Sequence, residues 1–354
     1  MRLYARYIGF AYFKAFLIVF LSLLLFYLGI DLLTNLKDLP KSANLQLLYV
    51  GMTALTAISY VLPISLVFGI IIAQINMVRQ NELVSLYALG ISKNSFILPP
   101  FFISIIITLC LIALNFTPFA YAQNYQRLIF KGLNFAQNTN DTFVKFDKKF
   151  IYIKELNSLN QTMQDVVIFD INQTELNGVT FAKSAKFLGD EWSLSEANVT
   201  ILPKILKVGE AGLEISNKTE LNTLKNFTPK SIVSANSSEK TSLNALDALD
   251  FISTFKDEGT SLNTAKSTLY SLVFAPLFAP LLLLIIYYHL PVSGRFFNLA
   301  ISSFICVLAT LIFWGISFVL AKFSSSGVIF AEIGILLPVI LLFIYAFYLF
   351  KRHC

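Results

Sequence analysis

The side chains that most often carry out chemistry are scarce in this sequence of 354 residues. Its two histidines, His289 and His353, are far apart, and its three cysteines lack the spacing of a zinc pattern or a disulfide framework. No Gly-x-x-x-x-Gly-Lys segment, nucleophile elbow or paired intramembrane carboxylate occurs. We therefore expect no catalytic residue, no metal site, no cofactor and no ATPase activity in this chain.

The most informative short segment runs from Arg79 to Ser92. Asn81 is a candidate N-cap, Glu82 falls in the first turn, where the helix dipole favours a carboxylate, and Gly90 can end the helix. Residues with i, i+3, i+4 and i+7 spacing form one face: Leu83, Leu86, Tyr87 and Gly90. The pattern predicts a short helix over about 79–91, whose apolar face needs a protein partner or lies on lipid.

The elements that flank this segment are long and apolar. Hydrophobic residues make up 56% of the chain and charged residues only 14%, so much of the surface must face lipid. Four charge-free runs exceed the roughly 20 residues that span a bilayer; they are 42–78, 94–126, 267–294 and 296–321. Together with two further apolar stretches, 8–30 and 328–350, these runs predict six transmembrane helices. Pro276 and Pro280 can kink the fourth helix.

The distribution of charge predicts the orientation. If the N-terminus is cytoplasmic, the cytoplasmic segments hold eight basic residues and only one acidic residue, Glu82. This bias follows the positive-inside rule. It also explains the net charge of +6 without a nucleic-acid partner. We expect a multi-pass membrane protein with both termini in the cytoplasm.

A polar region of about 140 residues separates the third and fourth spans. Short alternating segments bounded by turn residues predict antiparallel strands; they are 143–146, 150–153, 166–171, 179–187, 192–201 and 213–215. A connecting helix is predicted from Ser242 to Gly259. Its apolar residues are spaced three or four apart; they are Leu243, Leu246, Leu249 and Ile252 or Phe255.

The predicted fold class is therefore a bundle of six transmembrane helices with an antiparallel β domain, a sandwich or jelly roll, on the outer side between helices 3 and 4. The predicted boundaries are 1–122 for the first three helices with the helix at 79–91, 123–241 for the β domain, 242–266 for the connecting helix, and 267–354 for the last three helices.

This order of elements, with Arg-x-x-Glu-Leu-x-x-x-x-Ala-x-Gly-x-Ser at 79–92, resembles the lipopolysaccharide export permease family (LptF/LptG, YjgP/YjgQ). Arg6-Tyr7-Ile8, Phe227-Thr228-Pro229 and Phe274-Ala275-Pro276-Leu277 are also similar to its pattern. Asn35-Leu36-Lys37 and the end at Lys351-Arg352 look more like LptG, whereas 292–295 looks more like LptF. Of the two, the chain resembles LptG more.

The resemblance implies a non-ATPase permease subunit that extracts lipopolysaccharide from the inner membrane. Its partners would be a paralogous LptF-type permease, a cytoplasmic LptB-type ATPase dimer that uses ATP and Mg²⁺, and periplasmic bridge proteins of the LptC/LptA type. It also implies that the cytoplasmic helix inserts into the ATPase, with Glu82, Leu83, Leu86, Tyr87 and Gly90 as coupling residues. The alternative is a membrane-anchored periplasmic β adaptor or sensor without transport activity.

A phosphorylated, multiply acylated lipid needs cations at the outer rim of an apolar surface. The candidate phosphate contacts are Lys37, Lys41, Arg127 and Lys322; their alternative roles are solvated charges and, for Lys322, interfacial snorkelling. Since helices one and five line the lateral gate in the family, the candidate acyl-chain contacts are Phe26, Leu33, Phe313 and Phe318. Family members often carry a basic residue deeper in the first span, where this chain has Leu32 and Leu33.

Overall fold

The computed structural model describes residues 3–130, 138–147, 149–157, 160–172, 175–203, 212–229, 232, 243–254, 262–293 and 298–353. The chain forms two compact units, one from 1–131 with 266–354 and the other from 132–265. Ser242, Phe255 and Gly259, predicted for the connecting helix, lie outside the described residues, as does part of 292–295.

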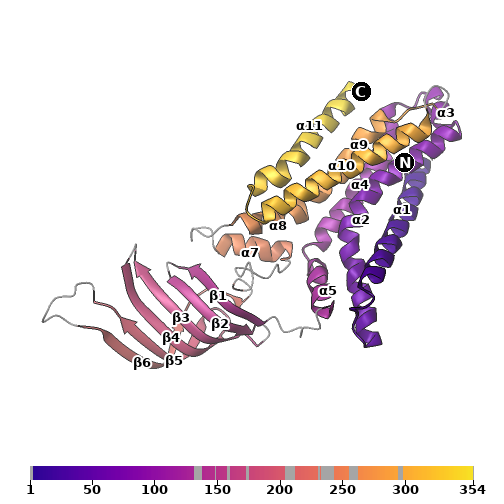
Figure 1. Cartoon of the computed structure of the whole chain (residues 1–354). Coiled ribbons are helices and arrows are strands. Elements are labelled where there is room, and N and C mark those ends of the chain that lie inside the picture. The colour runs from indigo at the N-terminus through magenta and orange to yellow at the C-terminus, as the bar shows by residue number, and fades with distance from the viewer. Residues whose placement is uncertain are drawn as a thin grey trace. The chain divides into compact units, whose positions relative to one another are not determined.

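Six helices of the first unit are long and apolar enough to cross a membrane, as the sequence predicts. Figure 1 shows them side by side, with α3 at the end of the bundle where both termini lie. The helices of this unit are α1 (Leu3–Asn35), α2 (Ala43–Arg79), α3 (Glu82–Ala88), α4 (Lys93–Leu114), α5 (Ala122–Phe130), α8 (Asn263–Val273), α9 (Phe278–His289), α10 (Leu299–Ser325) and α11 (Leu337–Arg352).

Three short helical turns complete this unit. A 3-10 turn, η1 (Pro118–Tyr121), precedes α5, and a second, η2 (Ala275–Leu277), separates α8 from α9 at the predicted kink. A π-helical turn, η3 (Glu332–Leu336), leads into α11. The proline ring removes a backbone donor, which accounts for the break at Pro276.

The helices pack where small residues bring backbones together. A Cβ atom added to Gly69 of α2 would lie 3.0 Å from Phe16 Cα of α1, and one added to Gly334 would lie 3.0 Å from the Leu320 carbonyl oxygen of α10. In a membrane, where lipid tails are as apolar as leucine, such close approach supplies much of the attraction between helices. The buried core of this unit draws on α1, α2, α3, α4, α9, α10 and α11.

The second unit contains one antiparallel sheet with strand order β1-β2-β3-β4-β5-β6. The predicted class, a helical membrane protein with an inserted antiparallel β domain, is confirmed, and the connectivity of the described strands is a meander. The strands are β1 (Asn138–Phe146), β2 (Lys149–Asn157), β3 (Thr162–Asn172), β4 (Glu175–Phe187), β5 (Trp192–Ile201) and β6 (Glu214–Thr223).

One face of the sheet forms a hydrophobic core with later parts of the unit. Ile153 pairs with Val166 and Val166 with Ala182, so that buried side chains line up across neighbouring strands. Phe251 of α7 (Ala245–Thr254) belongs to the same core, and so does Phe227, which follows β6. The unit can therefore bury its own apolar surface.

Two local expectations about these elements are wrong. Leu246 and Leu249 of α7 are exposed, and Ala245, Ala248 and Phe251 are buried instead, with Phe251 in the hydrophobic core of the β unit. Residues 122–130, predicted mostly as part of the β domain, form α5, which packs against α2 with Asn124 and Ile129 buried. Because α5 has only one apolar face, its composition is as polar as that of the β domain, and it was therefore predicted as part of that domain.

Candidate coupling helix and lipid-facing sites

The helix predicted over about 79–91 exists as α3. Asn81 adopts a left-handed conformation with φ of 58°, and its side chain makes no capping bond, so the capping role expected for it is wrong. Gly90 ends the helix as predicted, with φ of 84°. The Gly90 amide donates to Tyr87 and the Ile91 amide to Leu86, which is the Schellman pattern that glycine favours.

The predicted apolar face of α3 has its partner within the chain. Leu83 is fully buried in the bundle core, and Leu86 and Tyr87 pack against the same core. Two large apolar side chains here are exposed: Val84 of α3 and Leu89, the residue after its last turn, with 42% and 79% of their surface accessible. The sequence analysis missed these two residues, although both are apolar and lie outside the predicted stripe.

Aromatic side chains fix α3 to α4 and α9. The Tyr87 and Tyr287 hydroxyls lie 2.8 Å apart, and the Tyr287 hydroxyl donates to the Lys93 carbonyl oxygen at 2.9 Å. Since this uses the Tyr287 proton, Tyr87 is the donor of the first bond. Burial raises the pKa of Tyr87, which keeps this donor protonated. The Phe96 ring stacks on Tyr287 at 5.5 Å.

Glu82 connects α3 to α1. The Tyr7 hydroxyl lies 2.9 Å from both carboxylate oxygens of Glu82. A bond to a charged acceptor is stronger than one between neutral groups. Because α3 is thus attached to α1 and α9, a force on it would be transmitted to membrane-spanning helices.

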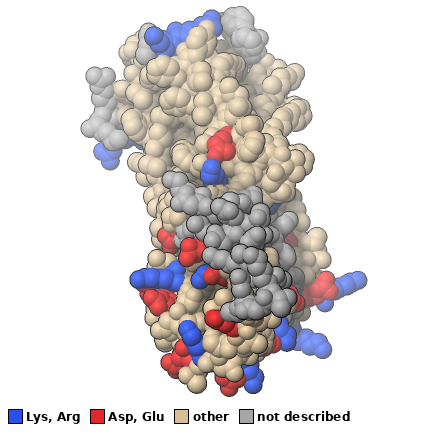
Figure 2. Space-filling view, turned by 90° about the vertical axis from the view of Figure 1, so that its left-hand side faces the viewer, with Lys and Arg blue, Asp and Glu red and all other residues tan. Residues whose placement is uncertain are grey.

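This end of the helical unit is positively charged. Arg79, Lys93, Lys351 and Arg352 lie at the ends of α2, α4 and α11. Figure 2 shows Lys and Arg at the tip of this unit above a broad surface almost without charge. An uncharged band with cations at one end is typical of a membrane-spanning segment.

The four cations predicted to bind phosphate lie toward the opposite ends of the helices but do not form one site. Arg127 lines a cavity of about 240 Å³ with Asp31 and Tyr49. Lys37 and Lys41 are exposed in the connection between α1 and α2 and do not line that cavity. Lys322 lies with its Nζ 5.4 Å from the centre of the Phe318 ring.

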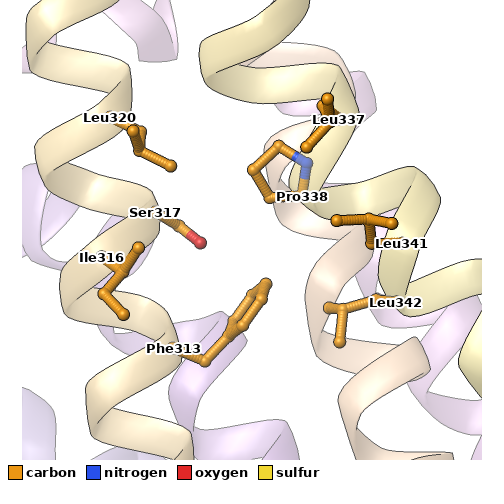
Figure 3. A pocket seen from close by; sticks show the side chains of 8 residues that line it. All are labelled: Phe313, Ile316, Ser317, Leu320, Leu337, Pro338, Leu341 and Leu342. Carbon is orange, nitrogen blue, oxygen red and sulfur yellow. The ribbon is translucent and has the colours of Figure 1, made fainter.

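The predicted acyl-chain contacts lie on two helices. Phe26 and Leu33 are exposed on α1, and Phe318 is exposed on α10. Phe313 points into an apolar cavity of about 350 Å³ between α10 and α11 (Figure 3). Its other lining residues are Ile316, Ser317, Leu320, Leu337, Pro338, Leu341 and Leu342.

Six apolar helices, a charged rim and a self-contained β unit define a multi-pass membrane protein with a large polar insertion. A family model, "Lipopolysaccharide export system permease LptF/LptG", matches residues 6–352. The chain therefore belongs to this family and is a permease component of the lipopolysaccharide export system, a membrane subunit that is not itself an ATPase. Its similarity does not distinguish LptF from LptG. No curated protein matches the chain.

Proposed function

We propose that this chain is the permease subunit of an ATP-driven transporter that extracts lipopolysaccharide from the bacterial inner membrane and passes it to a periplasmic bridge. The single observation that carries the proposal is the family match over residues 6–352. The energy source is a separate LptB-type ATPase dimer that uses ATP and Mg²⁺. The other partners are a paralogous permease and LptC/LptA-type proteins.

The attachment of α3 supports a role in coupling. In this proposal Val84, Leu89 and Glu82 contact the ATPase, whereas Leu83, Leu86 and Tyr87 hold α3 on the bundle. Movement of the ATPase then reaches α1 through the Tyr7–Glu82 bond and α9 through the Tyr87–Tyr287 bond. Gly90 ends the helix so that α4 can begin at Lys93.

The charge pattern supports the orientation. The end with α3 and the termini faces the cytoplasm, as the positive-inside rule requires. The β unit then lies in the periplasm, because an odd number of spans precedes it. The exposed apolar surfaces of α1 and α10, with Lys37, Lys41, Arg127 and Lys322 beyond them, accept the acyl chains and phosphates of the lipid.

Copurification of the ATPase with the membrane complex tests this proposal. We expect Leu89→Asp and Glu82→Lys to reduce the recovered ATPase roughly tenfold or more, because the first places a charge in an apolar contact and the second reverses a charge in the same interface. Leu188→Asp is the matched control, since Leu188 is an equally apolar, exposed residue of the β unit. Full recovery of the ATPase with both α3 variants would refute the proposed coupling.

A second measurement separates transport from a tethering role. Depletion of the chain from cells should stop newly made lipopolysaccharide from reaching the cell surface within a few generations. The Leu89→Asp variant should not restore it, whereas Leu188→Asp should. Unchanged surface lipopolysaccharide after depletion would favour an adaptor or sensor instead.

A further inference from the structure

The apolar cavity between α10 and α11 contains one polar side chain that the proposed function does not use. The cavity has a volume of about 350 Å³, and of the eight described residues that line it only Ser317 has a polar side chain (Figure 3). The Ser317 hydroxyl is buried and has no hydrogen-bond partner among the described residues. Such a hydroxyl costs free energy, most of all in a membrane, where no water replaces the partner. It therefore indicates a ligand group inside the cavity.

The direction of the Ser317 side chain differs from that of other hydroxyl side chains on the same helix. A serine or threonine in a helix can donate to the carbonyl oxygen three or four residues earlier. Ser303, Thr310 and Ser325 of α10 do so, with bonds of 2.9, 2.8 and 2.9 Å. The Ser317 hydroxyl points into the cavity instead (Figure 3). A group that enters the cavity can therefore accept its proton.

The cavity opens on the outer surface of the helical unit. Gly334 of η3 and the Leu320 carbonyl oxygen mark a close contact of this region with α10, where an added Cβ atom would lie at 3.0 Å. Leu320 also lines the cavity next to this contact. The lining residues Ile316, Leu337 and Leu341 are exposed, so they form the rim of the opening. Since this surface faces hydrocarbon in a membrane, the molecules that reach the opening are lipids.

Ser317 lies at the depth where lipid chains are esterified. The charge-free part of α10 ends at Lys322, which is about 7.5 Å further along the helix axis at 1.5 Å per residue. The polar layer on each side of the hydrocarbon is about 5–7 Å thick. With Lys322 in that layer, Ser317 lies at the edge of the hydrocarbon, where the ester groups of a glycerophospholipid are found.

The walls of the cavity do not suit water or an ionic ligand. A buried water needs two to four polar partners, and among the lining side chains only Ser317 supplies one. The same described residues include no charged side chain, so a phosphate or carboxylate would lack a counter-charge. A volume of about 350 Å³ is at the low end for small-ligand sites and suits one chain better than a multiply acylated cargo. A neutral ester with one apolar chain fits both the walls and the hydroxyl.

We propose that this cavity binds one acyl chain of a membrane glycerophospholipid, whose ester carbonyl oxygen accepts a hydrogen bond from the Ser317 hydroxyl. The headgroup stays outside the cavity, at the membrane surface. The chain fills the space between α10 and α11 and makes dispersion contacts with both helices. The inference goes beyond the proposed function, because this lipid is a resident component of the complex and not its cargo.

Photocrosslinking of the complete membrane complex tests the inference. A phosphatidylethanolamine with a photoreactive acyl chain should label segments 313–320 and 337–342. Two unlabelled competitors with the same headgroup and chains are compared, one with ester linkages and one with ether linkages, which lack the carbonyl oxygen. The ester lipid should reduce this labelling at a concentration about three- to tenfold lower, the range of one neutral hydrogen bond. Segment 301–305, where Ile301, Phe304 and Ile305 are exposed, should show no such preference.

Variants of Ser317 connect the preference to its hydroxyl. Ser317→Ala should abolish the preference, so that both competitors act at equal concentrations, whereas Ser317→Thr keeps a hydroxyl and should retain it. Ser303→Ala is the matched control, because the Ser303 hydroxyl donates to the Ala300 carbonyl oxygen and Ser303 does not line the cavity. In lipid-free detergent the Ser317 hydroxyl has no partner among the described residues, so there Ser317→Ala does not destabilise the protein.

Two results would overturn the inference without any need for a variant that folds. One is equal competition by the ester and ether lipids in wild type. The other is displacement of the photoreactive lipid by lipopolysaccharide at the concentration at which the ester lipid acts, because the cavity would then belong to the transport path. A preference that survives Ser317→Ala would also overturn it, since the hydroxyl would not be the group that recognises the ester.

Discussion

The two units of this chain differ in the side chains that organise their packing. In the β unit, Trp192, Met163 and Phe227 are buried, whereas no charged side chain is buried among the described residues of this unit. In the helical unit, Phe304, Phe343 and Phe347 are exposed, while Gly69 and Gly334 lie at close helix contacts. The β unit is organised by the hydrophobic effect in water, and the helical unit by close packing in a medium that accepts phenylalanine.

The largest effect is expected in the β core. Trp192 is fully buried, and its indole N–H donates to the Phe227 carbonyl oxygen. Trp192→Ala should destabilise this unit by about 3–5 kcal/mol, since it leaves a large cavity. Limited proteolysis between 138 and 223 of the full-length protein would measure this. Trp192→Phe, which keeps most of the ring, should cost much less, and equal susceptibility of both variants would contradict this view of the core.

A smaller but still large effect is expected where α1 meets α2. Gly69→Leu must push against the Phe16 backbone, so we expect a loss of about 3 kcal/mol, the upper range for overpacking. Gly51→Leu on the same helix has open space around its Cβ position and should be tolerated. Thermal aggregation of the purified complex measures both variants. If Gly69→Leu is as stable as Gly51→Leu, close backbone approach does not organise the helical unit.

A modest effect of opposite sign is expected at Ser317 of α10. Its hydroxyl is buried with no hydrogen-bond partner among the described residues, and it borders the apolar cavity of Figure 3. Ser317→Ala should therefore stabilise the unit by about 1 kcal/mol. Ser303→Ala on the same helix removes a hydroxyl that donates to the Ala300 carbonyl oxygen and should not stabilise. The melting temperatures of the two variants, compared with wild type, distinguish these outcomes.

The smallest effect is expected on the outer face of the sheet. Lys154 and Asp165 form an ion pair of 2.8 Å, and both side chains are exposed. Lys154→Ala should leave the melting temperature unchanged within error, because water and salt screen an exposed pair. A clear decrease would show that the outer charges, as well as the buried core, organise this unit.

Part of the candidate site could be predicted from the sequence. Gly90 and the polar residues that precede Leu83 predict the position of α3. The sequence also correctly places Glu82 in the first turn of this helix. The direction of its apolar face could not be predicted, because the same stripe suits a partner, lipid or the chain's own bundle. Only the burial of Leu83 shows that the bundle occupies it.

The polar cavity shows the same limit for residues far apart in sequence. Arg127 was predicted to act together with Lys37 and Lys41 because all three follow or precede spans on the same side. Asp31 was not among the predicted site residues. The packing of α5 on α2 brings Arg127 to the cavity that Asp31 and Tyr49 line.

By itself, the sequence determined the number of membrane helices, the inserted antiparallel strands, and the existence of α3 with its termination at Gly90. These features depend on runs of apolar residues, on alternation and on glycine, all of which act over a few neighbouring residues. The tertiary structure decided which face of α3 is free, which face of α7 is buried and which charges share a cavity. These features depend on contacts between residues distant in sequence, and such contacts form only when the helices and strands pack together.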